Sequence, residues 1–163
     1  FSLLIFFQVF VLNKIKFFDF FILSPLIIIL LLYTYERNSL KNLLFGFTIG
    51  LLVDIFNDSL GVYSMVSIII VYFRNFWVLK ILGEEKTSEV DEISIHQLGN
   101  FQYFMFSYPV ILIYFTLLVL LESSSFIKLD VLVFILLSSS LNYTFMVVFQ
   151  YLFLESKSSD EWR

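Results

Sequence analysis

The sequence predicts an all-α fold, a polytopic integral membrane bundle of about six transmembrane helices. Its 163 residues are 60% hydrophobic and 15% charged, with a mean hydropathy of +0.92, whereas soluble domains are about 45–50% apolar and about 25% charged. A small soluble domain keeps much of its surface exposed, so it would not bury 22 Phe and 9 Tyr. The composition excludes a soluble globular protein and a disordered chain. The net charge of −4, with no basic patch, excludes nucleic acid as a partner.

Six apolar runs supply the predicted helices: residues 1–12, 18–35, 40–56, 62–82, 101–121 and 131–154. Each run is continuous, unlike the alternating strands of a membrane barrel, so helices are favoured. The first run is shorter than the roughly 20 residues that cross a bilayer. We interpret it as a span whose start is cut off or lies in the headgroup layer. Residues 1–154 form one predicted transmembrane domain, and residues 155–163 form a cytoplasmic tail.

Loop charges predict the orientation, because cytoplasmic loops carry an excess of Lys and Arg. The side that holds both termini has seven of these residues, and the other side has three. The seven are Arg37, Lys41, Arg74, Lys80, Lys86, Lys157 and Arg163, and the three are Lys14, Lys16 and Lys128. Both termini are therefore predicted to be cytoplasmic. The acidic stretch 84–92 does not alter this, since acidic residues contribute little to the rule.

The third run and the turn after it hold the main candidate site. Gly46, Gly50 and Asp54 are spaced by four, so they share one helix face. The two glycines allow another helix to approach closely, and a carboxylate inside a span is a functional-site hypothesis. Three interpretations of Asp54 stay open: it fixes the following turn by bonding its backbone, it contacts a partner, or it holds a cation or proton. Asn57 and Asp58 are the oxygen ligands that could join it around a hard cation.

Arg74 is the single charge within the fourth run. It follows Gly61 by 13 residues, about 20 Å of helix, which places it at a different depth from Asp54. We therefore do not expect the two to pair. Arg74 either snorkels to the cytoplasmic headgroups beside Lys80 or forms an ion pair within the bundle or with a partner.

The sixth run carries a stripe of polar side chains at helical spacing: Ser139, Asn142, Tyr143 and Gln150. Such stripes usually bond neighbouring helices, which we favour over a path for a solute.

Residues for catalysis are missing from the sequence. There is no Cys and only one His, which removes thiolate chemistry and leaves no pair of strong metal ligands. No nucleophile elbow, P-loop, zinc-protease or dinucleotide-binding motif is present. We therefore predict no catalytic residue, no cofactor and no metal ligand, and we do not expect an enzyme.

Residues 50–65, GLLVDIFNDSLGVYSM, resemble the signature of MreD, the rod-shape-determining membrane protein family. That signature has a G-x-x-x-D segment ending one span and a short turn with glycine opening the next. The opening QVFVLN at residues 8–13, and Ser24-Pro25 in the second run, are similar to MreD proteins of Bacteroidetes-type bacteria. The specific part of the resemblance is residues 50–61.

The resemblance implies a non-catalytic scaffold of lateral peptidoglycan synthesis in the bacterial inner (cytoplasmic) membrane. Its implied partner is MreC and, through MreC, the RodA glycosyltransferase, a class B penicillin-binding transpeptidase and MreB. It also implies a fold similar to the substrate-binding subunits of energy-coupling-factor transporters. The alternative function is thus a solute-binding subunit of a vitamin or small-molecule transporter. The residues predicted to be structural or to contact a partner are Gly46, Gly50, Asp54, Asn57, Asp58, Gly61 and Arg74.

Overall fold

A computed structural model of the protein describes residues 23–33, 40–89, 93–122 and 129–153. All regular structure in these ranges is helical, as the sequence predicts. The helices are α2 (Pro25–Leu32), α3 (Leu40–Asn57), α4 (Val62–Glu89), α5 (Ile95–Leu98), α6 (Asn100–Glu122) and α7 (Leu129–Phe153). The predicted first span and the predicted tail, residues 155–163, lie outside the described ranges.

Four of the described helices are long and apolar enough to cross a membrane: Leu40–Asn57, Val62–Gly83, Asn100–Glu122 and Leu129–Leu152. They match the third to sixth predicted runs to within two residues at each end, which confirms a membrane protein. The helix of the fourth run continues past its predicted end to Glu89, with a kink at Gly83, where φ is 77°.

The second predicted run, residues 18–35, is not one continuous helix over the described part of its range. Ser24 has extended backbone angles, and the helix begins only at Pro25. Proline lacks an N–H and disfavours helical angles in the residue before it. It is therefore well suited to the first position of a helix, and a helix formed by the preceding residues does not continue through it. The resulting α2 has 8 residues, about 12 Å, so the helix alone does not cross a bilayer and the rest of the run would have to complete a span.

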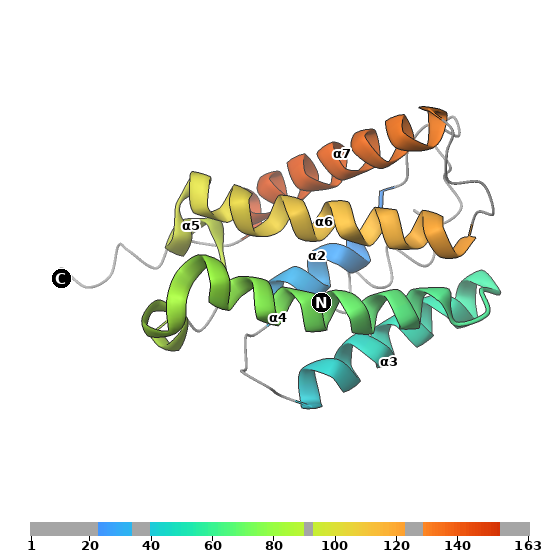
Figure 1. Ribbon diagram of the computed structural model, residues 1–163, viewed down its shortest axis with the longest axis horizontal. Helices are drawn as coiled ribbons and strands as arrows, with labels where there is room; N and C mark the ends of the chain where they lie inside the picture. The colour runs from blue at the N-terminus through green and yellow to red at the C-terminus, as the bar shows by residue number, and fades with distance from the viewer. Residues whose placement is uncertain (1–22, 34–39, 90–92, 123–128, 154–163) are drawn as a thin grey trace.

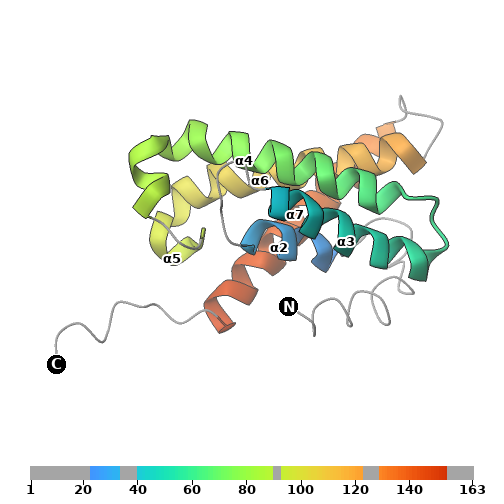
Figure 2. The same cartoon turned by 90° about the horizontal axis from the view of Figure 1, so that it is seen from below.

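The short α2 packs against three of the four long helices, α3, α4 and α6. α4 and α6 lie side by side, α3 packs beside α4, and α7 packs beside α6 (Figure 1). Seen from below, α2 lies against the α4–α6 pair, between α3 and α7 (Figure 2). Every residue from Pro25 to Leu31 is buried. This part of the second predicted run therefore belongs to the protein core.

Polar side chains hold both ends of α2. The Ser24 N–H donates to Asn142 Oδ1 of α7 at 2.8 Å, and the Ser24 hydroxyl shares a 2.8 Å hydrogen bond with the Tyr114 hydroxyl of α6. At the other end, the Arg74 guanidinium of α4 donates to the carbonyl of Tyr33. Backbone groups at membrane depth need such partners, because lipid supplies none.

The polar stripe of α7 partly fits its predicted role in helix packing. Asn142 reaches α2, and the Gln150 amide accepts the Ile95 N–H at 2.9 Å and donates to the Tyr103 hydroxyl. Ser139 instead donates to the Ile135 carbonyl of its own helix. Tyr143 packs its ring edge-on against Phe104 and Tyr108 of α6, with centroids 5.3 and 6.0 Å away.

Replacing Asn142 with leucine tests whether α7 holds the start of α2. The change keeps a similar volume but leaves the buried Ser24 N–H without its acceptor, so we expect unfolding to become easier by about 1–3 kcal/mol. Ser140→Leu, on the exposed face of the same helix, should stay within about 0.5 kcal/mol. Thermal unfolding of both variants in detergent measures the difference. Equal stability of the two would contradict this account of the α2 end.

Candidate functional site

Two glycines let α3 and α4 touch backbone to backbone. A Cβ atom added at Gly50 would lie 2.5 Å from Ser64 Cα and 2.7 Å from the Tyr63 carbonyl oxygen. One added at Gly46 would lie 2.8 Å from the Val71 Cγ2 methyl. The first obstruction is backbone and the second is a side chain, so Gly50 sets the closest approach of the two helices. The predicted small-residue face is the one that packs against α4.

The turn that follows has two residues in the left-handed region. Asp58 has φ 52° and Gly61 has φ 84°. Gly61 is the N-cap of α4, since its carbonyl accepts the N–H of Met65 at 3.1 Å. A glycine tolerates this φ without strain, but it offers no side chain to satisfy the free N–H groups of the first helical turn.

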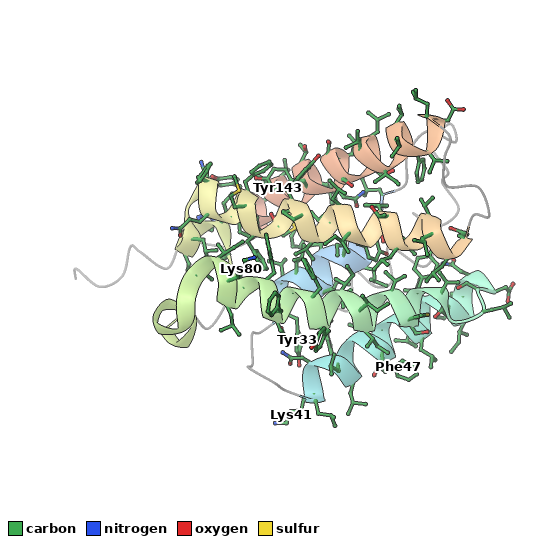
Figure 3. The ribbon with its side chains drawn as sticks, in the orientation of Figure 1. Tyr33, Lys41, Phe47, Lys80 and Tyr143 are labelled. Atoms are coloured by element: carbon green, nitrogen blue, oxygen red, sulfur yellow. The ribbon has the colours of Figure 1, made fainter. Side chains whose placement is uncertain are left out.

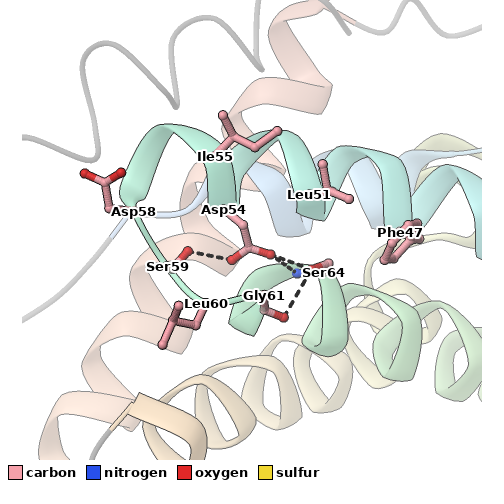
Figure 4. Close-up of a pocket in the computed structure, with 9 residues that line it drawn as sticks. All are labelled: Phe47, Leu51, Asp54, Ile55, Asp58, Ser59, Leu60, Gly61 and Ser64. Carbon is pink, nitrogen blue, oxygen red and sulfur yellow. Dashed lines mark hydrogen bonds between the residues drawn. The ribbon is translucent and has the colours of Figure 1, made fainter.

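Asp54 supplies the missing cap from the neighbouring helix. Its Oδ1 accepts the Tyr63 N–H at 2.9 Å and the Ser59 hydroxyl at 2.5 Å. Its Oδ2 accepts the Ser64 N–H at 2.8 Å and the Ser64 hydroxyl at 2.5 Å. These bonds are drawn in part in Figure 4. The carboxylate is 5% exposed, and it lies at the positive end of the α4 dipole, where an anion is favoured.

This geometry agrees with the interpretation that Asp54 fixes the turn. Four donors from the turn and the start of α4 occupy its two oxygens. The Asp58 side chain points away from Asp54 (Figure 4), so these two carboxylates do not converge on a cation. Asn57 ends α3 on the same turn. Within the described ranges, no three His, Cys, Asp or Glu side chains group as a metal site.

An open pocket of about 500 Å³ lies on the outside of this turn, and we call it the corner pocket (Figure 4). Its apolar wall is formed by α3 and by the fully exposed Leu60 at the tip of the turn. Its polar rim is formed by the turn and by the first residues of α4. The lining residues are Phe47, Leu51, Asp54, Ile55, Asp58, Ser59, Leu60, Gly61 and Ser64.

Comparisons of this chain with protein-family models, with curated proteins and with solved structures find no match. Its function is therefore proposed from the sequence resemblance and from the chemistry of its own residues.

Arg74 is the one predicted site residue whose favoured placement is wrong. Its side chain is completely buried within the bundle, so it does not snorkel to headgroups. It points from α4 to the end of α2, where the guanidinium bonds the Tyr33 carbonyl. A cation is favoured at a helix C-terminus, where the last carbonyls lack intrahelical partners. As expected, Arg74 does not pair with Asp54, whose bonds go to the α3–α4 turn and the start of α4.

Charged residues lie at both ends of the described bundle, and the end of α4 beyond Gly83 holds Glu84, Glu85 and Glu89 as well as Lys86. Asp58, Glu122 and Asp130 lie at the end where α3 meets α4. Lys80 lies toward the other end, and Lys41 lies at the start of α3 (Figure 3). No basic side chain is described at the end that holds Asp58, and Lys14, Lys16 and Lys128, which the sequence predicts on this side, lie outside the described residues.

Sequence reasoning did not identify the residues that complete the site. Ser59 and Ser64 supply hydroxyl donors to Asp54, and Tyr63 and Ser64 supply the backbone donors. A signal for them exists: Gly61 opens the helix without a capping side chain, and a carboxylate precedes it by seven residues. That pattern indicates a cap supplied from the previous helix.

Substitutions at Gly50 test the close approach of α3 and α4. Gly50→Leu should be far more harmful than Leu51→Phe, because Leu51 is exposed while any Cβ at Gly50 meets the α4 backbone. Gly50→Ala should also destabilise, by about 1–3 kcal/mol of overpacking, although alanine is intrinsically the better helix former. Gly46→Ala should cost less. Unfolding in detergent provides the measurement, and equal stability of the Gly50 and Leu51 variants would remove the basis for the shared face.

Proposed function

We propose that this protein is a non-catalytic scaffold of the bacterial cell-elongation machinery and a member of the MreD family. It maintains rod shape by binding MreC and thereby joins RodA, a class B penicillin-binding transpeptidase and MreB. In this proposal the chain is multi-pass in the inner membrane, with about six spans, both termini cytoplasmic and the α3–α4 turn on the outer side. The element that contacts MreC is the α3–α4 corner.

The observation that carries the proposal is the complete use of Asp54 inside the corner. The segment that resembles the MreD signature places Gly50 at the helix contact, Asp54 at the cap and Gly61 at the start of α4. Each of these residues therefore has a structural role. Both Asp54 oxygens already accept two hydrogen bonds from the corner, so neither is available to bind an ion or a solute. Rigid presentation of a turn is what a scaffold requires, because a preorganised surface loses less entropy on binding.

A solute-binding transporter subunit is the alternative, together with a fold similar to the energy-coupling-factor subunits. Such a subunit needs a pocket whose polar groups are available to a ligand. Here the Asp54, Asn142 and Gln150 side chains bond helix ends of the same chain. The corner pocket is open and lies on the outside of the bundle. These features favour the scaffold.

Two substitutions at Asp54 separate assembly from ion or solute binding. Asp54→Asn keeps the shape and part of the hydrogen bonding, whereas Asp54→Leu removes every bond to α4. If the corner is read by MreC, Asn should be partly tolerated. Leu should remain in the membrane, lose MreC co-purification by about tenfold or more, and give rounded cells. MreC co-purification and cell shape are scored at matched protein levels, with Glu122→Gln as a control for loss of a carboxylate at the same end.

The same assay can refute the assembly role. Full capture of MreC by Asp54→Leu in normal rods would do so directly. Loss of rod shape in Asp54→Asn while MreC stays bound would favour the ion or solute interpretation, because the charge itself would then be the function.

Cysteine labelling tests the proposed orientation. The chain contains no native cysteine, so single substitutions report without background. Ser88→Cys, between the fourth and fifth runs, should react with an impermeant thiol reagent only after the cells are opened. Ser124→Cys, between the fifth and sixth runs, should react from outside intact cells. The reverse pattern would place the α3–α4 corner in the cytoplasm and end the proposed contact on the outer side.

A further inference from the structure

Pro109 interrupts the hydrogen bonding of α6 from within. In an α-helix the N–H of residue 109 would donate to the carbonyl of Met105, four residues earlier. Proline has no N–H, and its ring crowds that same carbonyl, yet α6 continues from Asn100 through Pro109 to Glu122. Lipid offers no donor in place of the missing one. The Met105 carbonyl therefore depends on a donor from outside α6.

Trp77 of α4 is that donor. Its indole N–H donates to the Met105 carbonyl at 3.2 Å. Two neighbours on α4, about one helical turn before and after Trp77, orient the indole ring. Phe73 stacks on it with ring centroids 5.7 Å apart, and the Lys80 ammonium lies 5.6 Å from its centroid. The indole is thus positioned by its own helix, and α6 meets a donor that is already in place.

This contact lies at the edge of the α4–α6 pair and fastens only one part of α6. Met105 is exposed and Trp77 is partly buried. The first part of α6, residues 100–108, has a second side-chain bond on its buried side, where the Tyr103 hydroxyl accepts the Gln150 amide of α7. Beyond Pro109, the Tyr114 hydroxyl bonds the Ser24 hydroxyl in the core. Side chains of other elements therefore hold the two parts of α6 separately.

We propose that Pro109 is a hinge in α6 and that the Trp77 indole is the latch that keeps the hinge closed. While the bond is made, the first part of α6 stays against α4. When the indole leaves the Met105 carbonyl, that part tilts away from α4, because an unbonded carbonyl inside a span is costly and the tilt brings it toward water at the membrane surface. Gly99, with φ 79°, gives the moving end a flexible joint to α5.

The latch ties the direction of α6 to the position of α4. The donor lies on α4 and the acceptor on α6, so a rotation of α4 about its own axis would withdraw the indole and free the hinge. Asn100 lies nine residues, about 13 Å of helix, before Pro109. A bend of about 20°, at which helix kinks count as sharp, would therefore move Asn100 by about 5 Å. This coupling is independent of which partner the protein binds.

A double-mutant cycle tests the bond at the proline site. Trp77→Phe keeps an aromatic ring beside Phe73 but removes the N–H, and Pro109→Ala gives the Met105 carbonyl a donor within α6. Trp77→Phe should raise the unfolding equilibrium constant in detergent by about threefold more in the unsubstituted chain than in the Pro109→Ala chain. Phe76→Leu, at an exposed position beside Trp77, is the control and should have the same effect in both chains.

Spin labels test whether the hinge moves. The chain has no cysteine, so labels attach only at introduced sites. One pair, Tyr72→Cys and Phe101→Cys, joins exposed positions on α4 and on the first part of α6. The control pair, Met65→Cys and Leu120→Cys, joins exposed positions on α4 and on α6 beyond Pro109. Electron paramagnetic resonance of the full chain in lipid nanodiscs measures both distances.

Trp77→Phe should extend the distances of the first pair by about 5 Å and leave the control pair unchanged. Adding Pro109→Ala should restore the original distances. Two results would overturn the inference. An equal loss of stability from Trp77→Phe with and without Pro109 would mean that the indole acts by packing alone, and unchanged distances of the first pair in Trp77→Phe would mean that no hinge moves.

Discussion

The fold depends on one constraint: a helix end inside a bilayer must find partners for its free backbone groups within the protein. At the α3–α4 turn, Asp54 meets this constraint by accepting the N–H groups of Tyr63 and Ser64. The carboxylate reaches them only because Gly50 brings the α4 backbone against α3. The Gly50 contact, the α3–α4 turn and the buried Asp54 carboxylate therefore depend on one another, since Asp54 reaches the α4 N–H groups only when the two helices touch.

The same constraint explains three of the buried polar side chains elsewhere. Asn142 holds the N–H before α2, Arg74 holds the carbonyl after it, and Gln150 holds the first N–H of α5. Each of these residues comes from a long helix and bonds the end of a different, shorter one. These three polar side chains of the long helices thus bond backbone groups that have no partner within their own short helix.

Hydropathy and spacing predict the four long helices and the glycine face of α3, because a continuous apolar run has one stable form in a bilayer and residues four apart share a face. They do not predict α2 or the burial of Arg74. An apolar run looks the same whether lipid or protein surrounds it, so the interior position of Pro25–Leu32 is invisible to composition. Likewise, Arg74 looked like a headgroup contact because its partner is a backbone carbonyl distant in sequence.

The burial of α2 also constrains how the protein is made. Its helical part is too short to be stable alone across a bilayer, and every residue from Pro25 to Leu31 is buried. α3, α4, α6 and α7 follow it in the chain, so the residues that hold its two ends are synthesised after it. During translation, α2 must therefore wait for the helices that follow it. Folding then ends when the later helices pack against α2, and this step cannot finish until α7, which supplies Asn142, has been synthesised.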